Sequence, residues 1–343
     1  MRRILLFFKI FGIVLLGILL IFFSENIAKN IAGSIQICIS DIIPSMFAMM
    51  AVSTYAVSSG YYQTIFRPFY FLLRPFFRLD RHTLAVFLIS MIGGYPVGIK
   101  LLRERASQNK NDIAAVENAS VFCCCISPPF AISMIGVGIY HSAEIGIIVY
   151  LSNVLSCMVL AAVYSRFTEI ANEYRPKVCG GDLISAVNSA SRALFTVCTV
   201  LVACNAALEA VCSLLRLFSV SIDPLFLGVF EISNLLKLNS PSLSALPFVS
   251  AISAFGGLCV LIQCAAICGK AFPLKKFFLG RILSALLSAG FCKLILWSCN
   301  ITLPVLSGEA FGYQFSAQKG VWILLVLMAI IFFKKNEKFL KKG

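Results

Sequence analysis

Four short segments interrupt the apolar sequence with residues that could bind a solute or an ion. They are residues 93–98 (Gly-Gly-Tyr-Pro-Val-Gly), 127–129 (Ser-Pro-Pro), 231–234 (Glu-Ile-Ser-Asn) and 254–257 (Ala-Phe-Gly-Gly). Glycine and proline break helices, and broken backbone leaves N–H and C=O groups free. Half-helix N-termini favour anionic groups, whereas freed carbonyls coordinate cations. The candidate binding residues are therefore Gly94, Tyr95, Pro96, Ser127, Pro128, Glu231, Ser233, Asn234, Phe255, Gly256 and Gly257.

Glu231 is the most informative ionisable residue of these segments. A carboxylate inside a membrane segment is costly, so it usually faces a pathway or a partner. It could bind a solute, bind a coupling cation or carry a proton, and Ser233 and Asn234 add a hydroxyl and an amide beside it. The alternative is an exposed position near the outer surface, with Lys237 as its neighbour.

Four further polar residues lie in apolar surroundings, namely Asn153, Asn205, Glu209 and Gln263. Hydrogen bonds between membrane helices explain such residues more simply than ligand contacts do. Glu209 is the exception, because a ligand explains it as well as a structural bond. The glycine and proline breaks have a similar alternative, since these residues also kink helices or allow close packing.

Little in the sequence supports catalysis. The two histidines, His82 and His141, lie beside loops, and no metalloprotease, phosphate-loop or serine-hydrolase motif is present. Most of the 14 cysteines lie inside apolar segments without CxxC spacing, which is typical of small residues at helix contacts. The sequence therefore predicts no enzyme, no metal site and no cofactor, and leaves open a coupling Na⁺ or H⁺.

The composition requires membrane helices to position these segments. Of the 343 residues, 59% are hydrophobic and 13% are charged, whereas a soluble domain is about a quarter charged. A hydrocarbon core about 30 Å thick takes about 20 apolar residues per helix. We predict one all-α polytopic membrane domain over residues 1–343 with about eight transmembrane helices, at 4–23, 38–59, 119–140, 145–164, 193–215, 245–268, 282–299 and 321–333.

The basic residues predict the topology. They fall in short clusters between apolar runs, which argues against a nucleic-acid partner. Because cytoplasmic loops carry the excess of Lys and Arg, the best distribution places both termini in the cytoplasm of a cell-membrane protein. It also requires residues 84–102 and 225–238 to be re-entrant hairpins. The basic and aromatic residues 67–78 then lie at the cytoplasmic interface, where they suit anionic lipid.

The order of these elements repeats with inverted topology. Residues 38–165 contain a spanning helix, a hairpin that enters from inside, an interrupted helix and a second spanning helix. Residues 192–300 repeat this order with the hairpin entering from outside, and residues 1–23 and 321–333 flank the two repeats. In inverted-repeat transporters, broken helices meet near the membrane midplane. The candidate residues are therefore expected to form one central site.

The interruptions also carry a family resemblance. Residues 93–100 (GGYPVGIK), 122–130 (FCCCISPPF), 231–233 (EIS) and 253–258 (SAFGGL) resemble the YlbJ family of sporulation integral membrane proteins. That family is similar to the nucleoside recognition, or Gate, domains of concentrative nucleoside transporters, whose hairpins and broken helices hold the nucleoside and sodium. The chain lacks the Gln-Thr-Glu sequence of the nucleoside transporters' first hairpin. The resemblance implies equivalent places for Tyr95, Pro96, Ser127, Glu231, Ser233 and Phe255 to Gly257.

The pattern predicts a membrane transporter or permease for a small polar solute. The resemblance adds an association with sporulation and a nucleoside-like solute. The alternative is a non-transporting scaffold for assembly of the spore envelope. The lipid bilayer and the solute are the expected partners, and a homo-oligomer is compatible with the sequence.

Overall fold

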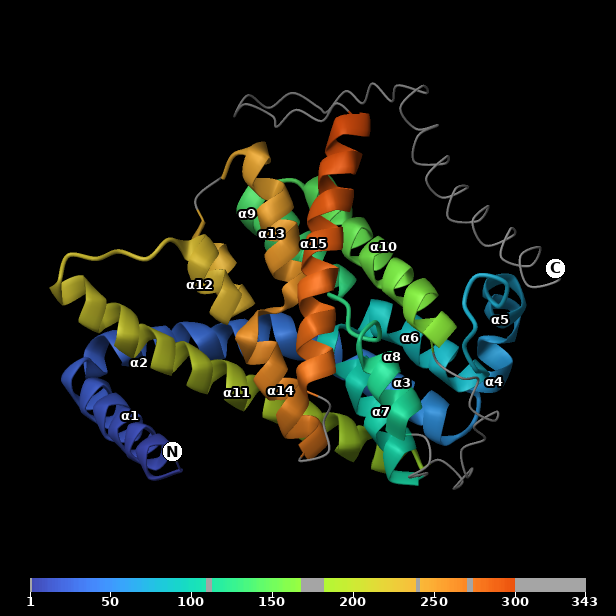
Figure 1. Cartoon of the computed structure of the whole chain (residues 1–343), viewed down its shortest axis with the longest axis horizontal. Helices are drawn as coiled ribbons and strands as arrows, with labels where there is room; N and C mark the ends of the chain where they lie inside the picture. The colour runs from blue at the N-terminus through green and yellow to red at the C-terminus, as the bar shows by residue number, and fades with distance from the viewer. Residues whose placement is uncertain (1, 109–112, 168–181, 239–240, 270–273, 300–343) are drawn as a thin grey trace.

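The computed structural model describes residues 2–108, 113–167, 182–238, 241–269 and 274–299, and their regular structure is entirely helical (Figure 1). This confirms the all-α prediction. The first half contains α1 (Arg2–Phe22), α2 (Ser24–Ile37), the π-helix η1 (Cys38–Ile42), α3 (Ile43–Ser58), α4 (Tyr62–Ile65), α5 (Arg67–Leu73), α6 (Arg81–Gly93), α7 (Tyr95–Gln108), α8 (Ile113–Ser120), the π-helix η3 (Phe130–Val137), α9 (Gly138–Tyr140) and α10 (Ala143–Phe167). The second half contains α11 (Leu183–Leu217), α12 (Pro224–Phe230), the 3-10 helices η4 (Ile232–Lys237) and η5 (Leu243–Ala245), α13 (Leu246–Phe255), α14 (Gly257–Cys268) and α15 (Leu274–Cys299).

Five helical runs among the described residues are long and apolar enough to cross a membrane. They overlap five of the eight predicted spans, and all five begin earlier in the chain than predicted. Their length and composition indicate a membrane protein. The runs are Ser24–Ser58, Ala143–Arg166, Leu183–Leu217, Leu243–Cys268 and Leu274–Cys299.

The other three predicted spans do not appear among these five runs. Residues 4–23 are helical as part of α1, and residues 321–333 lie outside the described residues. The predicted span 119–140 is wrong as a single helix, because α8 ends at Ser120 and helix resumes only at Pro128. The adjacent prolines 128 and 129 lack the N–H groups that a continuous helix requires there.

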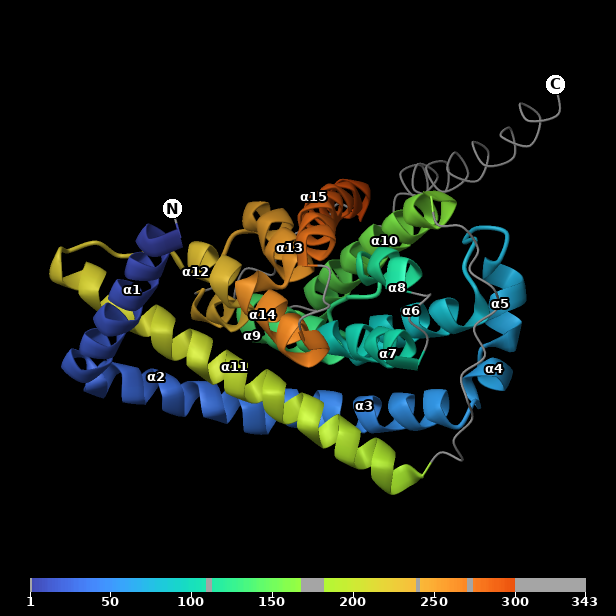
Figure 2. The same ribbon diagram turned by 60° about the horizontal axis from the view of Figure 1, so that its bottom comes forward.

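The helices α2, η1 and α3 form one run of 35 residues that lies along α11 (Figure 2). Pro44 has no N–H to donate to the carbonyl of Ser40, and the turn before it widens into η1. Helix α1 folds back from this run and packs against α2 and α11. This contact buries a small apolar cluster made of Leu19, Ile27, Ala206 and Ala210.

A second layer consists of α10, α13 and α15, with α6, α7 and α14 between it and α11 (Figure 2). Small residues let these helices approach closely, and their hydroxyl groups bond across the contacts. The Ser250 and Ser288 hydroxyls lie 2.7 Å apart. Asn153 of α10 donates to Ser253 at 3.1 Å and to Ser288 at 3.2 Å, which is the interhelical role predicted for it.

Each of the two segments predicted as a hairpin consists of two helices separated by a break, and we call them the first and second hairpin. The first is α6 and α7, which reverse at Gly94, where φ is +88° and glycine is the residue that adopts the turn readily. The second is α12 and η4, which are separated by the extended residue Glu231. Both segments are therefore interrupted near their centre, at Gly94 and Glu231; that they re-enter the membrane stays a prediction.

A buried ion pair closes the base of the first hairpin. Asp80 caps α6 by accepting from the N–H of Thr83 at 3.2 Å, and it pairs with Arg105 of α7 at 2.9 Å. The Arg105 side chain is 1% exposed. Burial raises the pKa of Asp80, but the charge of Arg105 and the Thr83 hydrogen bond outweigh it and hold that pKa below its ordinary value. The carboxylate thus stays ionised and ties the two helices together.

Replacing Asp80 with asparagine is expected to destabilise the protein by about 3–5 kcal/mol, because it leaves the guanidinium of Arg105 buried without its counter-charge. Thermal unfolding in detergent measures the loss. Asp182→Asn is the matched control, since Asp182 caps α11 in the same way at an exposed position and asparagine caps equally well. Equal midpoints for the two variants would show that the ion pair contributes nothing net.

Candidate functional site

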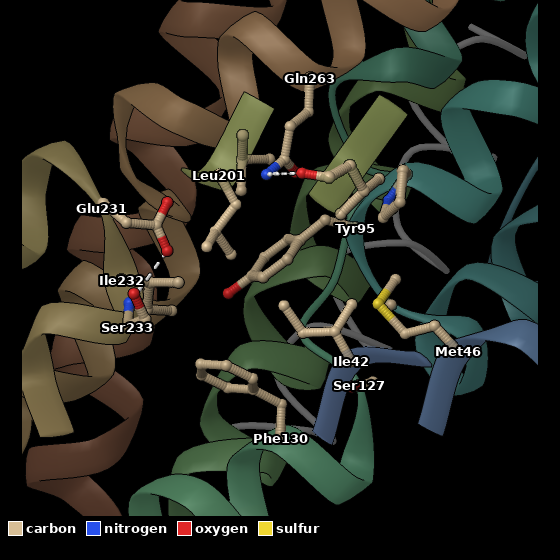
Figure 3. Close-up of a pocket in the computed structure, with 14 residues that line it drawn as sticks. Ile42, Met46, Tyr95, Ser127, Phe130, Leu201, Glu231, Ile232, Ser233 and Gln263 are labelled. Carbon is tan, nitrogen blue, oxygen red and sulfur yellow. Dashed lines mark hydrogen bonds between the residues drawn. The ribbon is translucent and has the colours of Figure 1, made fainter. Parts of the chain in front are cut away.

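A pocket lies between the two hairpins, η1, α11 and α14 (Figure 3). It has about 40 Å³ of space for water-sized molecules, more than one water molecule needs. Its wall is mostly apolar and carries a few polar side chains. We call it the central pocket, and its lining residues are Ile42, Met46, Gly94, Tyr95, Pro96, Ser127, Phe130, Val197, Leu201, Glu231, Ile232, Ser233, Val260 and Gln263.

The structure brings six of the eleven predicted residues to this pocket. They come from three of the four interruptions, which are far apart in the sequence. The apolar lining residues and Gln263 were not predicted as ligands; only Gln263 had a polar signal in the sequence. The six are Gly94, Tyr95, Pro96, Ser127, Glu231 and Ser233.

The other five predicted residues lie outside the pocket lining. A Cβ on Gly256 would lie 3.3 Å from the Tyr95 ring, and one on Gly257 would lie 3.0 Å from the carbonyl of Phe230, so the fourth interruption packs directly behind the wall. Asn234 donates to Asn205 of α11 at 3.2 Å.

The remaining two are Phe255 and Pro128. Phe255 packs edge-on against Phe278 of α15, and Pro128 opens the helical stretch that leads into η3. Both therefore support the breaks from outside the central pocket.

Glu231 is 1% exposed, so the alternative of a surface position beside Lys237 is wrong. Its Oε1 accepts the N–H of Ser233 at 3.1 Å, which caps η4. Its Oε2 is buried and accepts no hydrogen bond from an N–H or O–H group of the described residues, although the Cys259 thiol lies close enough to bond the carboxylate. A buried carboxylate with no basic partner is costly unless it takes up a proton or a cation. Glu231 is therefore a candidate binding group for one of these.

Tyr95 connects the first hairpin to the second broken helix. Its hydroxyl donates to the backbone carbonyl of Ser253, three residues before the break at Gly256. Its ring lies across the central pocket in Figure 3. The side chain therefore both lines the pocket and couples two of the interruptions.

Arg281 is the main functional-site residue that sequence reasoning missed. The positive-inside argument assigned it to a cytoplasmic loop, but it lies in α15 and is 0% exposed. Its guanidinium donates to the carbonyls of Val121 at 2.6 Å and Ala254 at 3.3 Å, and to that of Cys124. Broken backbone inside a membrane protein must find such donors. One cation thus supports two of the four breaks.

Two further cations assigned to cytoplasmic loops are also buried. They are Arg105, in the ion pair with Asp80, and Lys100, whose ammonium donates to Thr54 of α3 at 2.7 Å and is 5% exposed. Lys100 thereby ties the middle of α7 to α3. In all three corrections, a local polar partner replaces water around the charge.

The fold and the central pocket define an all-helical membrane protein in which broken helices meet around an enclosed carboxylate. Comparisons with protein-family models, with curated proteins and with solved structures find no match to this chain.

Proposed function

We propose that the chain is a membrane permease for a small polar solute, which binds in the central pocket. The observation that carries this proposal is Glu231, a fully buried carboxylate with one oxygen that accepts no N–H or O–H hydrogen bond from the described residues, at a pocket built from broken helices. Ionisable residues in such places usually mark an ion or substrate pathway. Packing alone gives no reason to place a carboxylate there.

The order of elements supports transport by alternating access. A long helix, a broken hairpin, an interrupted helix and a further long helix occur in 38–165 and again in 192–300. We infer that the second set is inverted relative to the first, with re-entrant hairpins and both termini in the cytoplasm, on the charge distribution given above. Rocking of one repeat against the other would then expose the central pocket to each side in turn.

The lining chemistry favours a small polar solute. Ser127, Ser233 and Gln263 offer hydroxyl and amide groups against apolar walls, which is typical of sites that orient an uncharged polar molecule. The resemblance to the YlbJ family adds sporulation as the setting and a nucleoside-like solute as a candidate. A solute of that size requires the hairpins to move apart, because 40 Å³ holds only a few waters.

The same small volume favours the rival proposal, a non-transporting membrane scaffold in spore-envelope assembly. In a scaffold the breaks would be packing devices, and the hydrogen bonds of Asn205 and Asn234 would fix helix contacts only. The two functions differ in one observable property. A permease must admit water to the central pocket from at least one side of the membrane.

Thiol labelling in membranes tests this difference. Cysteine is introduced singly at Ser127 and Ser233, because Gly94 and Gly257 have positive φ angles that a cysteine would strain. The half-buried native cysteines and Cys179, which lies outside the described residues, are first replaced by serine. The half-buried ones are Cys198, Cys204, Cys268 and Cys299.

For a permease, Ser127→Cys and Ser233→Cys are expected to react with impermeant thiol reagents more strongly from one side of the membrane. Ser288→Cys is the control, since Ser288 is 0% exposed between α13 and α15. If the two pocket cysteines are as unreactive as the control from both sides, the scaffold proposal replaces the permease.

A further inference from the structure

A file of polar side chains lies between α2 and α11, outside the central pocket. Asn30 and Ser34 are four residues apart on α2, and Asn205 and Glu209 are four residues apart on α11, so each pair shares one helix face. Asn30 donates to Glu209 at 3.2 Å, and Asn205 donates to Ser34 at 3.0 Å. The two faces therefore pair polar to polar over two successive helix turns.

The inner end of this file reaches the carboxylate of the central pocket. Asn205 donates to the hydroxyl of Ser233 at 3.3 Å and accepts from Asn234 at 3.2 Å. The N–H of Ser233 in turn bonds Glu231 at 3.1 Å. Hydrogen bonds thus run from Ser34 through Asn205 and Ser233 to Glu231, and Glu209 bonds Asn30, which lies one helix turn from Ser34 on α2.

The outer end of the file reaches the exposed end of α11. Arg216 pairs with Glu209 at 2.9 Å, and the side chain of Arg216 is 55% exposed while that of Glu209 is 9% exposed. Arg216 lies eleven residues beyond Asn205, about 16 Å along the helix at 1.5 Å per residue. Arg216 is thus exposed, whereas Glu209, Ser34, Asn205 and Glu231 are all buried.

The polar file has only one open end. The same two helix faces continue at spacing four past the file, but there they carry apolar or thiol side chains that line the pocket or lie beside it. Helix packing in lipid does not require this change of polarity at the pocket. The continuing residues are Cys38, Ile42 and Met46 on one face and Val197 and Leu201 on the other.

Two buried oxygens in this region accept no hydrogen bond from an N–H or O–H group of the described residues. They are Oδ1 of Asn30 and Oε2 of Glu231, one near each end of the file. Both can only accept, so each needs a donor such as water or a proton. Packed helices held together by polar contacts alone would leave neither oxygen in this state.

The groups around Glu231 favour a proton over a metal cation. The titratable groups that face it are Cys259 on α14, Cys204 on α11, Cys38 on η1 and Tyr95 on α7. Thiols are poor ligands for Na⁺, which takes oxygen ligands as other hard cations do. A carboxylate among neutral thiols and a phenol reaches neutrality most simply as the carboxylic acid.

We propose that this polar file conducts protons from the outer end of α11 to Glu231, and that H⁺ is the coupling ion of the permease proposed above, on which this inference rests. A proton from water at Glu209 passes through waters ordered by the Asn30, Ser34 and Asn205 side chains. It ends on Oε2 of Glu231, which becomes a neutral carboxylic acid. Water on the opposite side takes the proton when the central pocket opens there.

Glu209 is the collecting group of this route. It faces Arg216 and Cys212 on its own helix and Asn30 on α2, while Lys237 of η4 acts electrostatically on the neighbouring Cys212. Its ion pair with the exposed Arg216 places the Glu209 carboxylate at the water boundary, where the proposed route begins. Glu231 lies deeper, away from both cations.

Infrared difference spectroscopy of the purified full chain tests the proposal without a solute. The carboxylic-acid C=O band of Glu231 is assigned by its loss in Glu231→Gln. After transfer to D₂O, exchange of the acid proton shifts this band, and the rate of the shift reports access along the file. Asn205→Leu is expected to slow the exchange about tenfold or more, a change of about 1.4 kcal/mol in barrier.

Two further variants secure the result. Glu209→Gln keeps the hydrogen bond to Asn30 but removes the collecting carboxylate. It is also expected to slow exchange of the Glu231 proton. This variant therefore tests the proposed route if Asn205→Leu does not fold. Thr199→Val, on an exposed face of α11, is the control and is expected to exchange at the wild-type rate. Wild-type exchange in both file variants, or no Glu231 acid band at any pH, overturns the proposal. The permease proposal is tested separately, by thiol labelling of Ser127→Cys.

Discussion

Replacing Arg281 with methionine is expected to cost at least about 2 kcal/mol of stability, because three buried carbonyls lose the guanidinium, only one of them keeps another donor, the Cys157 thiol at 3.7 Å, and each carbonyl left unpaired costs about 1–3 kcal/mol. Those carbonyls belong to Val121, Cys124 and Ala254, in two segments that cannot bond as helix. Methionine replaces the aliphatic part of the side chain but ends where arginine has its Nε, so the contact of the guanidinium with the Phe277 ring is lost as well. The loss is measured as the shift of the thermal unfolding midpoint in detergent.

Lys276→Met on the same helix is the matched control. Lys276 is half exposed and pairs with Glu117 at 2.9 Å, and exposed ion pairs contribute about 0–1 kcal/mol. Arg281→Lys is expected to fall between the two, since an ammonium is a compact donor group that cannot span three carbonyls as the planar guanidinium does. If Arg281→Met unfolds at the midpoint of the control, the guanidinium does not hold the breaks.

The interruptions could be predicted because their signals are local. Proline at 128 and 129 and glycine at 94 and 256 act on the backbone where they stand, and the structure leaves the helix at each of these segments. Glu231 was also identifiable from the sequence, because a carboxylate in an apolar membrane segment is costly and usually faces a pathway or a partner. Six predicted residues meet at one pocket because interrupted helices bring their ends together.

The buried cations could not be predicted from the same reasoning. The positive-inside rule counts charge per loop and does not say which way a side chain points, so it placed Lys100, Arg105 and Arg281 on the cytoplasmic side without indicating that they are buried. The partner carbonyl of Arg281 at Val121 lies 160 residues away in the sequence. Helix α15 also begins at Leu274, eight residues before the predicted start, which places Arg281 two turns inside the helix.

The polar file could be predicted from the sequence only in part. The spacing of Asn30 and Ser34, and of Asn205 and Glu209, is visible in the sequence and places each pair on one helix face. An interhelical role was predicted for Asn205, and its bond to Ser34 confirms it. That α2 is the partner of α11 could not be predicted, because the first predicted repeat began only at residue 38. The predicted boundary cut α2 away from α3, with which it is continuous.

Glu231→Gln is expected to keep the fold and to abolish the pH response of the central pocket. If Glu231 carries a proton in this conformation, glutamine has nearly the same shape and still accepts the N–H of Ser233, so stability should change by less than about 1 kcal/mol. Protonation of Glu231 would bias the two access states, as a ligand that binds one state better does. Glutamine cannot take up or release that proton.

Thiol labelling of Ser127→Cys at varied pH measures the response, because Ser127 lines the same pocket as Glu231. In the otherwise unchanged protein, labelling from one side of the membrane should vary with pH, and with Glu231→Gln it should be constant. Glu209→Gln distinguishes the proton route from the protonated group itself. It is expected to slow protonation of Glu231 and to leave the final level of Ser127→Cys labelling at each pH unchanged. A pH response that survives Glu231→Gln would assign the switch to another group. A loss of about 3 kcal/mol or more in Glu231→Gln would mean that the fold holds an ionised carboxylate paired with a bound cation.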